Sequence, residues 1–168
     1  GDFFVRKLKA GVRPLAASPI LHPADSVISQ IGPIEGGRCV QAKGKSYSVR
    51  ELVKDEALAQ KVEHGLFATY YLCPTDYHRV HSPVDGEITR ISYIPGNLWP
   101  VNNWSAENID RLFGVNERVV VHINSRVAKC MLVFVGATNV GQIILSFDPD
   151  IVTNTAKTKQ AVDKTYPS

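Results

Sequence analysis

The sequence predicts a β-rich α+β fold, a single compact domain of mainly antiparallel strands with two short helices. Short apolar or alternating runs recur between turn residues along most of the chain. Only two segments carry the residues that begin a helix. The chain has 168 residues and 44% hydrophobic content, which is enough for one domain with a core, and it contains no internal repeat.

The expected strands are short and are separated by turn residues. They cover the ranges 26–32, 37–44, 66–73, 86–96, 116–124, 128–137 and 141–147. The range 66–73, LFATYYLC, is rich in aromatic residues, which favour strands. The range 86–96, GEITRISYIPG, alternates apolar and polar residues, as expected for a strand with one buried face.

Two helices are expected between these strands. Ser48 is followed three residues later by Glu51, which is the pattern of a capping box, so we predict a helix from there to about Val62, ending near Gly65. The second helix is predicted over 105–113, SAENIDRLF, with a serine cap and acidic residues in its first turn.

The chain divides into three parts by composition. Residues 1–20 mix aromatic and basic side chains, so they form either a membrane-surface segment or an edge that packs on the domain. Residues 21–147 hold the predicted strands and helices of a β-rich core. Residues 148–168 are polar, and we expect a loop or partial disorder there.

Charge and cysteine content exclude several classes of protein. A net charge of +3 is too small to indicate a nucleic-acid partner, although it suits an anionic surface. The three cysteines form no CxxC pair, so we expect no disulfide framework and favour a reducing compartment. No apolar run approaches the roughly 20 residues that a membrane-spanning helix needs.

The range 72–88, LCPTDYHRVHSPVDGEI, concentrates titratable and aromatic residues in a loop. His78 and His81 are three residues apart, which places both on one side of a turn or short helix. They are structural, or a metal pair, or acid–base catalysts near neutral pH. A second candidate, HPAD, spans His22 to Asp25; its aspartate caps the chain, or it orients a histidine as the acid of a triad does.

Five stretches carry a resemblance to a known family. PADSVISQIG, QAKGKSYS, CPTDYHRVHSPVDG, FGVNERVVV and VFVGATNVG occur in the same order as in phosphatidylserine decarboxylases, and the chain resembles their longer-form branch. The resemblance covers Phe3 to about Ile144. DYHRVHSPVDG is its most specific part.

The resemblance implies a pyruvoyl-dependent lyase of phospholipid synthesis. Such enzymes convert phosphatidylserine to phosphatidylethanolamine and CO2 through a pyruvoyl imine. Their proenzyme cuts itself before the serine of a Leu-Gly-Ser-Thr motif, and that serine becomes the pyruvoyl group of a small α chain. The resemblance further implies a homodimer on an anionic membrane surface, either the cytoplasmic side of a bacterial inner membrane or the mitochondrial inner membrane.

The family's roles transfer to three residues here. Asp25 matches an acidic relay residue, His81 the histidine that it orients for self-cleavage, and His78 the histidine of decarboxylation. Tyr77 and the prolines of the loop are expected to fix the direction of the two rings. No residue of this chain is expected to carry the cofactor or a metal.

Two departures from the family pattern keep alternatives open. Ser26 stands where the family usually has glycine, and no Leu-Gly-Ser-Thr motif is present. Ser168 follows Pro167, so it does not match the prosthetic serine. We expect a processed β chain or a truncated form. The alternatives are a catalytically incomplete lipid-binding domain of the same fold, and a metal hydrolase that uses both histidines and a carboxylate.

Overall fold

The central feature is a four-stranded antiparallel sheet. The computed structural model describes residues 3–155 and 160–167. Within these ranges the sheet has the strand order β10-β5-β6-β7. Its members are β5 (Glu87–Ile94), β6 (Arg118–Asn124), β7 (Lys129–Val135) and β10 (Val162–Thr165).

Three strand pairs complete the strand content of the described residues. They are β1 (Val27–Pro33) with β4 (Leu66–Tyr71), β2 (Arg38–Ala42) with β3 (Lys45–Ser48), and β8 (Ile144–Leu145) with β9 (Asp148–Val152). All three pairs are antiparallel. The predicted class, a β-rich α+β domain of mainly antiparallel strands, is confirmed.

Strand β6 lies between two hydrophobic clusters. Its alternate residues Val119, Val121 and Ile123 pack into one cluster together with Leu145 and Ile151 of the β8–β9 pair. Val120 points the other way, into a cluster formed mainly by the helices and by β2 and β3. The period of two therefore buries both faces of this strand, because each face has a layer of structure above it.

The helices are four in the described residues, where two were expected. They are α1 (Val49–Val53), α2 (Glu56–Lys61), α3 (Asn103–Asn108) and α4 (Leu112–Val115). Lys54 (φ 55°) and the extended Asp55 separate α1 from α2, and residues 109–111, of which Arg111 has φ 56°, separate α3 from α4. The hydrophobic pattern alone did not show these breaks.

The helix caps agree only in part with the prediction. Ser48 accepts a hydrogen bond from the backbone N–H of Glu51, as the capping box predicts. Asp55 caps the separate helix α2 through Leu58 N–H. The predicted serine cap of the second helix is wrong, because Asn102 caps α3 instead and Ser105 supplies the donating N–H.

The range 148–168 is not simply a polar loop. It contains β9 and β10, so the expectation of loop structure is wrong for these two strands. Their charged residues are paired across strands: Asp148 is buried and accepts from Lys164 Nζ at 2.5 Å. Polar composition suggested a loop because sequence alone does not show this pairing. The expectation of partial disorder at 156–159 and 168 lies outside the described residues.

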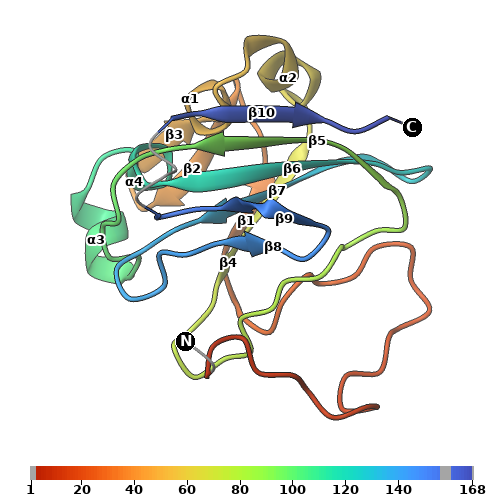
Figure 1. The fold of residues 1–168 in the computed structure, drawn as a ribbon. Coiled ribbons are helices and arrows are strands. Elements are labelled where there is room, and N and C mark those ends of the chain that lie inside the picture. The colour runs from red at the N-terminus through yellow and green to blue at the C-terminus, as the bar shows by residue number, and fades with distance from the viewer. Residues whose placement is uncertain (1–2, 156–159, 168) are drawn as a thin grey trace.

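Two irregular segments gather at one side of this scaffold. In Figure 1 the N-terminal segment (red to orange) and the loop that follows β4 (yellow-green) lie together below the sheet, away from α1 and α2. A backbone hydrogen bond from Leu21 N–H to Pro83 O, 2.8 Å long, joins them. Every candidate residue predicted from the sequence lies on these two segments.

Candidate functional site

The histidine loop, residues 72–86, connects β4 to β5. A tight turn opens it, in which Cys73 N–H donates to Asp76 Oδ2 at 2.8 Å and Asp76 N–H donates to Cys73 O at 2.8 Å. Residues 77–82 then continue without a helix or a turn. The expectation that the three-residue spacing puts His78 and His81 on one side of a turn or short helix is therefore wrong.

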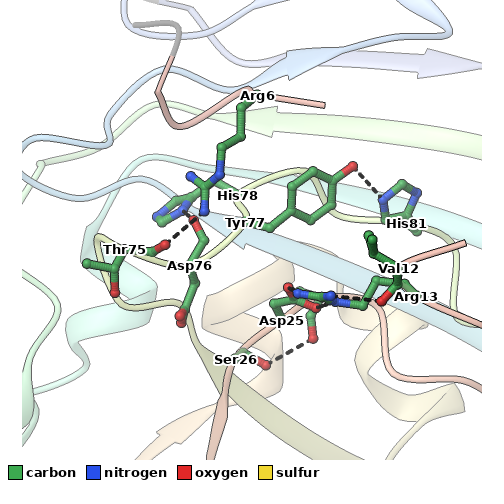
Figure 2. Close-up of polar contacts among 11 residues, drawn as sticks. Arg6, Val12, Arg13, Asp25, Ser26, Thr75, Asp76, Tyr77, His78 and His81 are labelled. Carbon is green, nitrogen blue, oxygen red and sulfur yellow. Dashed lines mark hydrogen bonds and ion pairs between the residues drawn. The ribbon is translucent and has the colours of Figure 1, made fainter. Parts of the chain in front are cut away.

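Tyr77 lies between the two histidines (Figure 2). Its ring is buried and stacks on the His81 ring, with centroids 5.6 Å apart. Its hydroxyl is 3.0 Å from His81 Nε2. The expectation that the tyrosine of this loop fixes a histidine ring is confirmed for His81, whose own side chain is exposed.

His78 is half-buried and has one ring nitrogen committed to the backbone. Its Nδ1 is 2.9 Å from Asp76 O, and since a carbonyl only accepts, Nδ1 carries the proton. A neutral His78 therefore has its lone pair on Nε2, where it is available for proton transfer. The Phe4 ring meets the His78 ring edge-on at 4.8 Å, and Phe4 O accepts from His78 N–H at 3.3 Å.

The N-terminal segment holds the histidine loop through two arginines. Arg6 Nη2 donates to Thr75 O at 2.8 Å, and Arg79 Nε donates to Val5 O at 2.7 Å. Both acceptors are backbone carbonyls, so the contacts fix the path of the chain on either side of His78. Residues 4–6 thus contact the histidine loop, whereas residues 9–20 of the segment are exposed.

Asp25 is brought beside the loop by the backbone. His81 N–H donates to Pro23 O at 2.8 Å, two residues before Asp25. The Asp25 carboxylate, however, binds Arg13, with 2.9 Å from Nε to Oδ1 and 2.6 Å from Nη2 to Oδ2 (Figure 2). Among the described residues no hydrogen bond joins Asp25 to His81, so the relay between them stays a prediction.

The charges around Asp25 keep it ionised. The hydrogen bonds from Arg13 lower the pKa of Asp25 below its ordinary value of 3.8, and the charges of Arg6 and His81 act in the same direction. The same pairing raises the pKa of Arg13. Asp25 is therefore a carboxylate at neutral pH and is able to stabilise an imidazolium nearby.

A pocket of about 400 Å³ opens beside Asp25. Its lining consists of His22, Ala24, Asp25, Ser26, Ile28 and Tyr70. His22 Nδ1 is 3.0 Å from Tyr70 Oη, which links the HPAD segment to β4. The pocket therefore presents imidazole, hydroxyl and carboxylate groups to one space.

Ser26 fits this position without strain. Its backbone is not among the described non-glycine residues with positive φ, so the glycine usual in the family is not needed here for conformational freedom. The Ser26 hydroxyl donates to Ala24 O at 3.3 Å and lines the pocket. The departure thus adds a hydroxyl group to the pocket.

Two contact residues of the site were not predicted from the sequence. Arg13 was counted only as one of the basic residues of the N-terminal segment, and Tyr70 only as part of an aromatic strand. Twelve residues of irregular chain separate Arg13 from Asp25, and 48 positions separate His22 from Tyr70. No local spacing encodes either contact, so a single sequence offered no signal for them.

Metal and membrane features were searched over the same described ranges. No group of three or more histidine, cysteine, aspartate or glutamate side chains there is arranged to hold a metal ion. None of the helices described is both long and apolar enough to cross a bilayer.

Comparison with known proteins adds a family to this geometry. The family profile described as "Phosphatidylserine decarboxylase" matches residues 1–164. The chain belongs to the phosphatidylserine decarboxylase family. The match includes the whole histidine loop, the HPAD segment and all ten described strands up to Lys164, so the family resemblance predicted from five short motifs is confirmed.

Several relatives carry the name phosphatidylserine decarboxylase proenzyme. The protein of Anaeromyxobacter sp. is 44% identical over 153 residues, which are 90% of this chain and 54% of the relative. That of Vibrio parahaemolyticus is 50% identical over 145 residues, 84% of this chain and 51% of the relative. That of Vibrio cholerae is 51% identical over 147 residues, which are 86% of this chain and 52% of the relative. The chain thus spans about half the length of the curated relatives it matches.

Proposed function

We propose that this chain is the β-chain portion of a phosphatidylserine decarboxylase, which converts phosphatidylserine to phosphatidylethanolamine and CO2. The observation that carries the proposal is the histidine loop: a family-matched segment holds His78 and His81 on opposite sides of Tyr77, and His81 N–H donates to Pro23 O in the segment that carries Asp25. The name proenzyme among the relatives supports a precursor that is processed into two chains. The partner is then the small α chain of the same precursor.

The prosthetic group of this proposal is a pyruvoyl group made from a serine outside this chain. The residues present fit such a group, because the pocket of about 400 Å³ offers the hydroxyl of Tyr70 and the imidazole of His22 as hydrogen-bonding partners for a carbonyl. His22, Ser26 and Tyr70 would hold it. When bound, the pyruvoyl carbonyl supplies the sink for the electrons that remain on the substrate as CO2 leaves.

His78 delivers the proton in this account. Its Nδ1–H is held by Asp76 O, so the proton that it delivers is the one that Nε2 carries in the imidazolium form. Half-burial and the Phe4 ring restrict water around His78, which favours loss of the substrate's charged carboxylate. A histidine suits this task because it exchanges a proton near neutral pH.

His81 acts earlier, during self-cleavage of the precursor. It accepts the proton of the attacking serine hydroxyl, and a carboxylate stabilises the imidazolium that results. Asp25 supplies that carboxylate once it turns from Arg13 to His81. Tyr77 keeps the His81 ring in place through the contact of 3.0 Å at Nε2.

The remaining proposals concern location and assembly. Phe3, Val5, Lys7 and Lys9 are exposed on the N-terminal segment, a combination that suits an anionic membrane surface. We place the protein on the cytoplasmic side of a bacterial inner membrane or on the mitochondrial inner membrane, as a homodimer; family resemblance supports these three assignments.

A mass spectrum of the purified full-length protein, with CO2 release from phosphatidylserine, tests the proposal. We expect two chains, the smaller one blocked by pyruvoyl, and CO2 release in proportion to that chain. A single intact chain without CO2 release would instead identify a catalytically incomplete lipid-binding domain. Activity that needs an added metal and no pyruvoyl would identify a metal hydrolase.

A further inference from the structure

Strand β10 runs toward the end of the sheet where the histidine loop joins β5. Its register on β5 pairs Val162 with Tyr93 and Thr165 with Arg90, and Tyr166 N–H continues the ladder to Thr89 O at 2.9 Å. Because the two strands are antiparallel, β10 points at the start of β5, directly after Gly86 of the loop. Figure 1 shows the C-terminal end on the side where the loop enters β5.

Arg90 holds β10 in this position with a forked contact. Its Nε donates to Asp163 Oδ1 at 2.8 Å, and its Nη2 donates to Asp163 Oδ2. Its Nη1 donates to Asp55 Oδ2 at 2.7 Å, and Ser92 Oγ donates to Asp163 Oδ1 at 2.6 Å. We call Arg90, Asp163, Asp55 and Ser92 the β10 clasp.

The two aspartates of the β10 clasp are charged, and hydrogen bonds fix their positions. Arg90 lowers the pKa of Asp163, and desolvation only partly opposes this shift, so Asp163 stays charged at neutral pH. Asp55 is fixed from its other oxygen, which accepts from Leu58 N–H and caps α2. The clasp therefore ties the edge strand to a rigid helix end and not to a mobile side chain.

Burial alone does not explain the position of β10. The strand has four residues, of which three are exposed, so it contributes little apolar area to the sheet. Its inner contacts are polar: the β10 clasp on one side, and Lys164 with Tyr166 on Asp148 on the other. Directed polar contacts of this kind fix the register of a strand more than they raise the stability of the fold.

A cavity of about 590 Å³ lies at the end of β5 to which β10 points. Its lining consists of Pro19, Asp85, Gly86, Glu87, Asn124, Ser125, Arg126 and Val127. The β10–β5 ladder reaches Thr89, two positions from Glu87. Strand β10 therefore points toward the end of the sheet where this cavity lies, and Asp85 and Gly86 of the cavity lining belong to the histidine loop.

We propose that Arg90 is a positioning residue for self-cleavage: through Asp163 it sets the course of the precursor segment that follows β10, so that this segment occupies the cavity at Gly86 and approaches His81. The occupant is the precursor's own chain, since the matched part of this chain covers only 54% and 51% of two relatives named proenzymes. The inference rests on the proposed function.

Full-length precursor with Arg90→Gln tests it, with the rate of cutting followed by mass spectrometry. We expect cutting to slow by about 10- to 10²-fold, the size of effect that a displaced reacting group produces. CO2 release per pyruvoyl group in the processed fraction should stay at the wild-type value. Asp163→Asn should slow cutting equally, the double variant should be no slower than either single variant, and Arg90→Lys should restore part of the rate.

The matched control is Arg50→Gln. Arg50 also forms an arginine–carboxylate pair, with Glu56 at 3.2 Å, but both side chains are more than half exposed and neither touches β10. This variant should cut at the wild-type rate. For the case that Arg90→Gln fails to fold, Ser92→Cys combined with Asp163→Cys, at positions directly opposite in the register, replaces the clasp by a disulfide. Oxidation should then speed cutting and reduction slow it.

Three results would overturn the inference. If the Arg90→Gln precursor is cut at the wild-type rate, Arg90 has no positioning role. The same conclusion follows if the variant with both cysteines is cut at one rate whether oxidised or reduced. A parallel fall in cutting and in CO2 release per pyruvoyl would make the β10 clasp only a structural contact. Wild-type precursor that never cuts would instead overturn the proposed function, and this inference with it.

Discussion

The central sheet and the histidine loop are held together by different forces. Ile91 of β5 and Val119 of β6 are fully buried and pack in the same hydrophobic cluster. In the loop region His81 and Arg13 are exposed, and backbone hydrogen bonds and arginine contacts hold the segments together. The sheet thus contains fully buried apolar residues, whereas the loop carries the candidate reactive groups.

The two regions also differ in how far apart in the sequence their contacting residues lie. Each strand of the sheet needs only an apolar pattern and a neighbour along the chain, as in the run from β5 through β6 to β7. The site needs residues 3–25 to find residues 72–86, with no regular structure to guide them. Changes in the sheet should therefore alter stability first, and changes in the loops should alter function first.

The largest expected effect is in the sheet. Ile91→Ala removes a fully buried side chain and leaves a cavity, so we expect the free energy of unfolding to fall by about 2–5 kcal/mol in urea titrations. Ile31→Ala, at a side chain that is 70% exposed on β1, is the matched control and should change it by less than about 0.5 kcal/mol. Equal losses in the two variants would contradict the assignment of stability to the sheet.

Gly86 lies where the two regions meet. A Cβ atom there would stand 2.5 Å from Asn124 O and 3.0 Å from Ile123 Cγ2, so Gly86→Ala should destabilise the protein by about 1–3 kcal/mol and displace the histidine loop. Gly114→Ala in α4 meets no atom within 4 Å and should be neutral or slightly stabilising. Thermal unfolding of both variants checks this; a harmless Gly86→Ala would show that the junction is loose.

The sequence predicted most of the scaffold because its strands are encoded locally. The apolar runs at 66–73, 86–96, 116–124 and 128–137 correspond to β4, β5, β6 and β7. It missed β3, β9 and β10, and it missed the breaks at Lys54 and Arg111. These depend on charge pairs such as Arg90 with Asp163, and on left-handed residues, neither of which alters the hydrophobic pattern.

The family motif indicated the candidate residues of the site but not their contacts. His78, His81 and Asp25 were found through the family motif, and the structure places all three on two segments that touch. The contact of Arg13 with Asp25, and the separation of the histidines by Tyr77, follow from chain paths that no local pattern describes. A family motif indicates which groups are candidates, whereas the tertiary structure decides which partner each one has.

Binding of the N-terminal segment to an anionic membrane should depend on two exposed lysines. Arg6 and Arg13 are engaged in internal contacts, which leaves Lys7 and Lys9 exposed. Replacing both lysines by Gln should weaken binding to anionic vesicles by about 2 kcal/mol, roughly 30-fold, most clearly at low salt. The control is Lys54→Gln with Lys61→Gln near the helices. Vesicle sedimentation measures both, and equal weakening would indicate only net charge.

The smallest expected effect concerns Arg13 and stability. Because Arg13 lowers the pKa of Asp25, Arg13→Gln should raise that pKa toward 3.8, as seen by NMR titration of the carboxyl group. A carboxyl group whose pKa is lowered by folding stabilises the folded state at pH values above its unfolded-state pKa. This stabilisation is lost as the pH falls through the folded-state pKa. The stability difference between wild type and variant should therefore be present at neutral pH and vanish in acid. A difference that grows in acid would contradict the pairing.

The central claim is that the histidine loop serves two reactions with two differently held histidines. Mass spectra and CO2 release of full-length His81→Ala and His78→Ala precursors test it directly. We predict that His81→Ala stays uncut, whereas His78→Ala is cut and carries pyruvoyl but releases CO2 about 10²-fold more slowly. If both variants stay uncut, or if His78→Ala is cut and turns over at the wild-type rate, the two-reaction account is wrong.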